Sequence, residues 1–240
     1  MTITRRFLLG VDLAKSFDYT SLAVIEMDRP AETRDAVYHL RALDRIRGVD
    51  YPQITETIIS TVKRLGTETG IVDGPHLCLD ASGLGAPIRD YLKQDPTFYS
   101  CGCMTGKQIY PVVFTGGESA RRDPETGNYN ISKALIIGNF LALMQHRRFD
   151  YAPDLQALPL LEEEIASFKR HTSPSGKTGF DAEQGGHDDL ICAVCIPLII
   201  AEMVYKNEQT GPLVFHGATG PARWRDANTG GVPSWLSGWI

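Results

Sequence analysis

The sequence predicts an α/β fold in which a mixed central β-sheet is flanked by helices. Three apolar segments at about 7–12, 20–27 and 37–47 indicate an opening meander of strands, the third antiparallel to the second. Apolar residues then recur at helical spacing within 51–69. A short apolar strand at 77–80, a glycine turn and a helix at 87–93 follow, which is the order typical of α/β proteins.

The remaining elements are predicted by the same patterns. We expect a strand at 110–114, an exposed polar loop at 119–130, a helix at 131–147, a short strand at 149–152 and a helix at 155–169. A hairpin at 170–179 and an apolar helix at about 190–205 follow. Residues 207–240 are rich in Gly, Pro, Thr and Trp and lack periodicity. We therefore expect one domain over 1–206 and an extended or partly disordered tail over 207–240.

Composition excludes several classes of protein. The chain has 240 residues and a net charge of −5, which gives no support for a protein that coats nucleic acid. Five cysteines show no disulfide framework, so a reducing compartment is expected. Cys192 and Cys195 lie within an apolar helix, where core packing is expected rather than zinc binding. No apolar run is long enough to span a membrane.

Acidic residues stand at the ends of predicted elements. Asp12 and Asp80 each end an apolar strand, and Asp188 and Asp189 begin the last helix. Neighbouring parallel strands that both end in Asp bring two carboxylates to one sheet edge, where a cation must compensate their charge. Oxygen ligands of this kind suit Mg²⁺ or Mn²⁺, and two such ions can clamp a phosphodiester displacement. Each acid alone is more typical of a turn or cap, so the prediction depends on their combination.

The motifs resemble a known family. Gly10-Val11-Asp12 with Asp18-Tyr19-Thr20-Ser21-Leu22, then Leu79-Asp80-x-x-Gly83-x-Gly85, then His187-Asp188-Asp189-Leu190-x-x-Ala193 are similar to the nuclease domain of phage terminase large subunits. The resemblance covers about residues 7–205 and implies an RNase H-like (RuvC-like) fold. It also implies an endonuclease that cuts concatemeric viral DNA during genome packaging.

The resemblance assigns roles by position. It implies that Asp12, Asp80 and Asp188, with Asp189 as second choice to Asp188, hold two Mg²⁺ or Mn²⁺ ions and carry the catalysis. Asp18 and His187 are possible accessory residues, and basic residues are candidates for contacts with phosphates of double-stranded DNA: Lys133, Lys169, Arg170 and Lys177. The implied partners are a packaging motor ATPase, the portal or the small terminase. The implied location is the cytoplasm of the infected bacterial host, with no membrane.

Different interpretations of the sequence remain open. The P-loop motor of terminase large subunits has no counterpart here, because His171–Thr178 lacks the first glycine of the nucleotide-binding motif. A Holliday-junction resolvase has a similar fold and late helix. The sequence also permits a sugar-kinase-like or actin-like ATPase half, or a non-catalytic module of the packaging complex. Glu162-Glu163-Glu164 is interpreted as a solvated helix face.

Overall fold

The computed structural model describes residues 3–13, 19–33, 35–69, 74–83, 85–96, 108–117, 119–172, 178–182 and 187–206. Within 67–69, 168–172 and 178–182 it describes the backbone only. Of the predicted site residues, Asp18 and Lys177 therefore lie outside the described residues, as does the predicted tail over 207–240.

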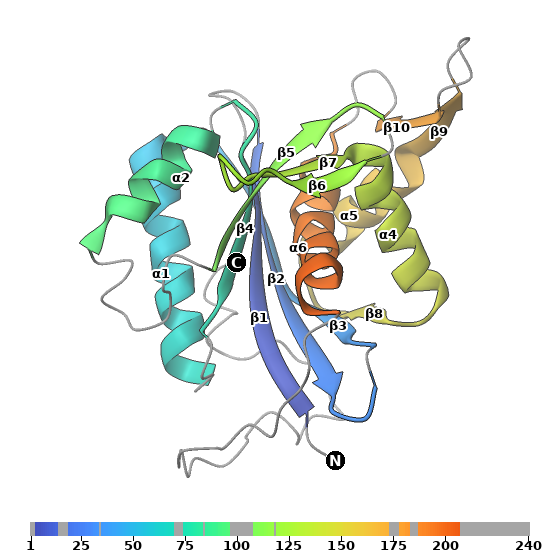
Figure 1. Ribbon diagram of the computed structural model, residues 1–240, viewed down its shortest axis with the longest axis horizontal. Coiled ribbons are helices and arrows are strands. Elements are labelled where there is room, and N and C mark those ends of the chain that lie inside the picture. The colour runs from blue at the N-terminus through green and yellow to red at the C-terminus, as the bar shows by residue number, and fades with distance from the viewer. Residues whose placement is uncertain are drawn as a thin grey trace.

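Eight of the described strands form one mixed sheet in the order β6-β7-β5-β4-β1-β2-β3-β8 (Figure 1). β1 pairs antiparallel with β2, and β2 antiparallel with β3, which confirms the predicted meander. β1 pairs parallel with β4, β4 with β5, and β5 with β7. The strands are β1 (Ile3–Asp12), β2 (Tyr19–Pro30), β3 (Val37–Arg47), β4 (His76–Asp80), β5 (Ile109–Thr115), β6 (Ala120–Arg122), β7 (Tyr129–Ser132) and β8 (Phe149–Tyr151). A separate hairpin consists of β9 (Phe168–Thr172) and β10 (Thr178–Ala182).

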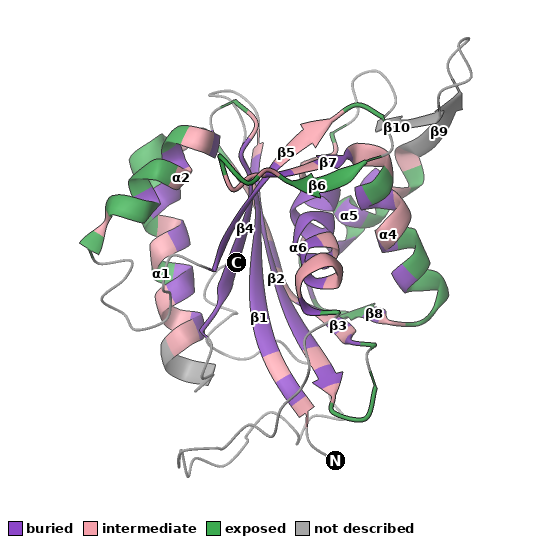
Figure 2. Ribbon diagram, in the orientation of Figure 1, coloured by how far each residue is buried: buried purple, intermediate pink, exposed green. Residues whose placement is uncertain are grey.

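Helices cover both faces of the sheet, as Figure 1 shows. α1 (Tyr51–Thr69) and α2 (Gly85–Gln94) lie on one face; α4 (Lys133–Gln145), α5 (Leu158–Ser167) and α6 (Asp189–Tyr205) lie on the other. The two faces of β1 explain this, because alternate residues of a strand point to opposite sides. Leu9 and Val11 pack in the core beneath α1, whereas Leu8 packs in the core beneath α6. Figure 2 shows the central strands β1, β2 and β4 largely buried between these two layers, whereas β6 at the edge of the sheet is exposed.

Among the described helices that cover the sheet, α6 is the most deeply buried, and its apolar sequence reflects this. Cys192 and Cys195 are buried in it as free thiols, which confirms their expected place in the core. Its far end is fixed by polar contacts: the Tyr205 hydroxyl lies 2.7 Å from the Tyr110 hydroxyl and 2.8 Å from His76 Nδ1. Burial lowers the pKa of His76 to about 3. In the described part of the chain, no helix is long and apolar enough to cross a membrane.

Several predicted elements differ from the structure. The segment 119–130, expected as a loop, contributes β6 and the first residues of β7 at the edge of the sheet. The predicted helix 155–169 begins only at Leu158 and ends at Ser167, since the chain enters β9 at Phe168. Glu164, expected on a solvated face, is buried, with 5% of its surface exposed.

Candidate functional site

The register of two parallel strands brings Asp12 and Asp80 to one edge of the sheet. Val11 pairs with Leu79, so the next residue of each strand, Asp12 and Asp80, lies beside the other. Both aspartates point to the α6 face, because Leu8 and Cys78, an even number of residues earlier on their strands, pack there. This confirms the expectation that the two strands are parallel neighbours.

Asp80 is held by the turn that follows β4. Its side chain is buried, and the Ser82 backbone N–H donates a hydrogen bond of 2.8 Å to Asp80 Oδ1. Burial raises the pKa of Asp80, whereas the Ser82 donors and the nearby Lys133 oppose the rise. The turn is compact, because a Cβ on Gly85 would come within 1.8 Å of the Asp80 carbonyl oxygen. Only glycine fits there, which accounts for the predicted glycine turn.

The last helix brings the second pair of acids to the same edge. Asp188 occupies the N-cap position of α6 and Asp189 is the first helical residue. The pKa of Asp12 is raised well above its usual range, first by burial and then by the charges of Asp80, Asp189 and Asp188. The four acids that the sequence singled out therefore lie near one another, close enough for the charge of each of the other three to raise the pKa of Asp12.

A lysine from the start of α4 reaches into this acidic cluster. Lys133 Nζ donates a hydrogen bond to Asp188 Oδ2. Its positive charge partly opposes the rise in the pKa of both Asp12 and Asp80. Ser132 holds the start of α4 in place, because its hydroxyl accepts a hydrogen bond from Leu135 N. Lys133, predicted as a contact to DNA, thus lies among the carboxylates.

Asp189 lies in a different environment from Asp188. Arg45 on β3 donates to Asp189 Oδ2 at 3.0 Å, and its guanidinium stacks over the Tyr19 ring at 3.9 Å. His187 lies beside this group: its Nδ1 is 3.6 Å from Asp189 Oδ2, and its ring meets the edge of Tyr19 with centroids 5.3 Å apart. Asp188 therefore contacts the lysine, whereas Asp189 pairs with the arginine.

Sequence reasoning did not assign two residues near this cluster, Arg45 and Glu164, to the site. Arg45 is one charge among several in β3 and carries no motif. Glu164 follows Leu161 by three residues and so shares its buried helix face, which was the available signal. Burial raises the pKa of Glu164 to about 7, while the Ile191 N–H and Arg45 oppose this rise.

The donor set fits a hard divalent cation in its chemistry. Among the described residues, no group of three or more His, Cys, Asp or Glu side chains is gathered tightly enough to hold a metal ion as the structure stands. Asp12, Asp80, Asp188 and Asp189 nevertheless supply only carboxylate oxygens, the ligands that Mg²⁺ and Mn²⁺ prefer. The buried Ser21 hydroxyl, paired with Asp12 across the sheet, has no hydrogen-bond partner within the described ranges. Additional positive charge would stabilise this edge, because it would offset the repulsion of Asp12 by Asp80, Asp189 and Asp188.

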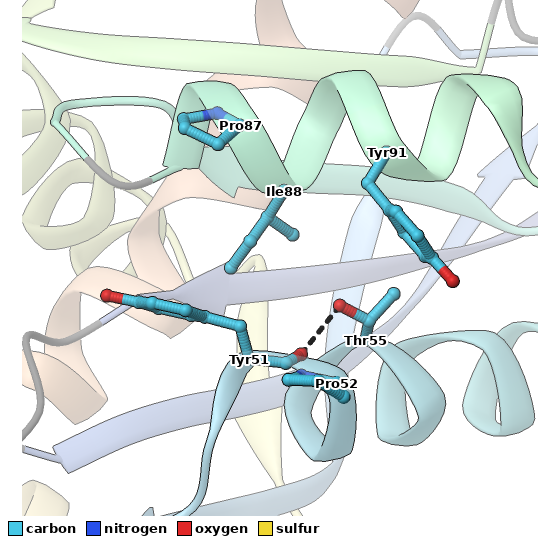
Figure 3. Close-up of a pocket in the computed structure, with 6 residues that line it drawn as sticks. All are labelled: Tyr51, Pro52, Thr55, Pro87, Ile88 and Tyr91. Atoms are coloured by element: carbon cyan, nitrogen blue, oxygen red, sulfur yellow. Dashed lines mark hydrogen bonds between the residues drawn. The ribbon is translucent and has the colours of Figure 1, made fainter.

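The remaining predicted contacts to DNA are only partly placed. Lys169 pairs with Asp181 and Arg170 with Phe180 in the β9–β10 hairpin, where the backbone alone is described. An apolar groove of about 310 Å³ lies elsewhere, between α1 and α2 (Figure 3). The described residues that line it include no acid: Tyr51, Pro52, Thr55, Pro87, Ile88 and Tyr91. The acidic cluster is thus separate from this groove.

Comparisons with known proteins place the fold. No protein-family model matches the sequence, and no curated protein matches it. Among solved structures, the human cytomegalovirus terminase nuclease domain, soaked with manganese, is similar with a TM-score of 0.52 and 13% identity, over 83% of this chain and 86% of that chain. The chain has the fold of a terminase nuclease domain.

Two phage structures show the same fold. The large terminase nuclease domain of Thermus phage P74-26 matches with a TM-score of 0.50 and 17% identity, over 80% of this chain and 78% of that chain. The large terminase nuclease of thermophilic phage G20c, with bound cobalt, matches with a TM-score of 0.50 and 16% identity, over 81% of each chain. The terminase nuclease fold predicted from the motifs is therefore confirmed.

Proposed function

We propose that the protein is a metal-dependent DNA endonuclease of the terminase large subunit type, with its site at the edge where β1, β4 and α6 meet. One observation carries this proposal: Asp12, Asp80 and Asp188 come from three distant segments and lie at one edge of a terminase nuclease fold. Similar domains were solved with cobalt or after a manganese soak, which supports the use of a divalent ion here.

Asp12, Asp80 and Asp188 would hold two Mg²⁺ or Mn²⁺ ions. When bound, the ions lower the pKa of a water molecule and stabilise the leaving oxygen of a phosphodiester. We favour Asp188 over Asp189 as the third ligand, because Asp188 binds Lys133, whose charge also acts on Asp12 and Asp80, whereas Asp189 pairs with Arg45 on β3. We propose that the substrate is double-stranded viral DNA and that the nuclease domain spans 1–206. Its proposed partners are a motor ATPase, the portal or the small terminase, in the host cytoplasm. Backbone contacts carry no base information, so cutting would be independent of sequence.

The test is cleavage of supercoiled plasmid by the purified chain with Mn²⁺ or Mg²⁺. The substitutions Asp80→Asn and Asp188→Asn should each abolish cutting, and Asp189→Asn should reduce it less. Asp90→Asn is the matched control, since Asp90 is an exposed aspartate on α2 that pairs with Arg89. Persistent cutting by Asp80→Asn and Asp188→Asn would reject the assignment. A strong preference for four-way junctions over plasmid would favour a Holliday-junction resolvase.

Lys133 gives a separate prediction. Without DNA its amine binds Asp188, and with DNA and metal present we expect it to donate instead to a phosphate oxygen at the cut. Lys133→Met should lower the cutting rate at saturating Mn²⁺ by about 10²-fold, the usual cost of losing one donor to a developing negative charge. Mn²⁺ affinity, measured by calorimetry, should not fall, because a competing positive charge is removed. Weaker Mn²⁺ binding together with an unchanged cutting rate would contradict this role.

A further inference from the structure

The N-terminus of α6 is capped by a side chain from another helix. Asp188 occupies the N-cap position, but its side chain makes no capping hydrogen bond. Glu164 on α5 serves instead: its Oε2 accepts a hydrogen bond of 2.9 Å from the Ile191 N–H. Glu164 is only 5% exposed, whereas its neighbour Glu163 is exposed. The free N–H groups at the start of a helix need an acceptor, and here that acceptor comes from 27 residues earlier in the chain.

Arg45 ties the same carboxylate to the sheet. In the sheet register Asp12 pairs with Ser21 and Ser21 pairs with Arg45, so the three residues stand in one row across β1, β2 and β3. Paired residues share a face, and this row faces α6. Arg45 Nη1 lies 3.7 Å from Glu164 Oε1, and Arg45 Nη2 lies 3.0 Å from Asp189 Oδ2. One planar guanidinium therefore joins β3, α5 and the first residue of α6.

We propose that Glu164 and Arg45 form a brace that sets the position of the α6 N-terminus, so that Asp188 faces Asp12 and Asp80. Both are positioning residues that touch neither the metal nor DNA. This inference rests on the proposed function, since the geometry that the brace fixes is that of the metal ligands. It also gives Asp189 a role of its own: Asp189 is the point where the brace holds the helix, and Asp188 is the ligand.

The physical basis is the burial of the brace. The Arg45 side chain is 12% exposed and that of Glu164 is 6% exposed, so each charge depends on the other and on its hydrogen bonds. Removing the Glu164 carboxylate leaves the Ile191 N–H without its acceptor and weakens the hold on Arg45. Metal ligands must be held to within about 0.5 Å, so even a small shift of the helix start weakens metal binding.

The test uses the whole chain and Mn²⁺ alone as the probe. Glu164→Ala is compared with Glu163→Ala, which makes the same chemical change one residue away on the exposed surface. Calorimetry should show about 10-fold weaker Mn²⁺ binding for Glu164→Ala, the low end of the cost of losing an outer support of a metal ligand. Cutting should recover towards the wild-type rate at saturating Mn²⁺. Glu164→Gln should restore the affinity, because its amide oxygen can accept from the Ile191 N–H.

A residue with a purely structural role would lower thermal stability without changing the Mn²⁺ affinity. Equal Mn²⁺ binding by Glu164→Ala and Glu163→Ala would therefore overturn the brace, as would a Glu164→Gln variant no better than Glu164→Ala. If Glu164→Ala does not fold, Arg45→Lys is the deciding variant: it keeps the charge, loses the planar fork and should bind Mn²⁺ more weakly. A wild-type protein that neither binds Mn²⁺ nor cuts DNA overturns the proposed function itself. Wild-type cutting with unaffected Glu164 and Arg45 variants overturns the brace alone.

Discussion

Asp12→Asn is expected to abolish cutting and, at the same time, to stabilise the metal-free protein at pH 8. The loss of cutting should be about 10³-fold or more, because a metal ion stabilises the reacting charges by several kcal/mol and about 1.4 kcal/mol corresponds to a factor of ten. The gain in stability has a different cause, which is the position of Asp12 among like charges at a partly buried edge of the sheet.

Burial and the charges of Asp80, Asp189 and Asp188 raise the pKa of Asp12 in the folded state. An acid whose folded pKa is raised binds its proton more tightly when folded, so the stability of the wild type falls as pH rises from its unfolded pKa through its folded pKa. At pH 8 the ionised carboxylate therefore destabilises the fold, and the neutral amide of Asn does not. The difference between the two proteins should shrink at pH 5.

Thermal melts in EDTA measure this effect. Asp12→Asn should raise Tm at pH 8 by a few degrees, the size that about 1 kcal/mol produces in a chain of this length. At saturating Mn²⁺ the wild type should instead have the higher Tm, because the metal stabilises the protein that binds it. Asp90→Asn serves as the control: Asp90 is exposed and Arg89 lowers its pKa, so its replacement should not raise Tm. A lower Tm for Asp12→Asn at pH 8 in EDTA would contradict the account.

The same residues show what the sequence could reveal. Asp12 and Asp80 were predictable because each follows a strand buried on both faces, and the parallel pairing of such strands fixes which edge they share. α6 was predictable because its sequence is almost continuously apolar. The pairing of Arg45 with Glu164 was not predictable, since the two residues lie 119 positions apart. Local patterns do not report a pairing of that kind.

The edge of the sheet was missed for a related reason. β6 (Ala120–Arg122) is exposed along its length, so it shows no alternation of apolar and polar residues. It is a strand only because β7 lies beside it and supplies hydrogen-bond partners. The prediction of an exposed loop over 119–130 was therefore right about exposure and wrong about structure.

Gly10→Ala is expected to destabilise the protein by about 3 kcal/mol, at the upper end for overpacking a core. A Cβ at position 10 would come within 1.9 Å of the Ala193 carbonyl oxygen and 2.7 Å of Pro197 Cδ. Neither can move as a flexible side chain could. Pro197 has no N–H, so the Ala193 carbonyl lacks its usual donor in the helix and lies directly over β1 at Gly10. Only glycine allows α6 to approach the strand this closely.

The matched control is Gly138→Ala in the middle of α4, where a Cβ meets nothing within 4 Å. There the substitution should stabilise the fold by about 0.5–1 kcal/mol, because alanine favours the helix. Urea unfolding of the two variants should therefore give changes of opposite sign. Gly10→Ala should also lose cutting and Mn²⁺ affinity, since it displaces the helix that carries Asp188. A Gly10→Ala variant as stable as the wild type would show that α6 can move away from β1 at no cost, and the close approach at Gly10 would then not be what places Asp188 beside Asp12.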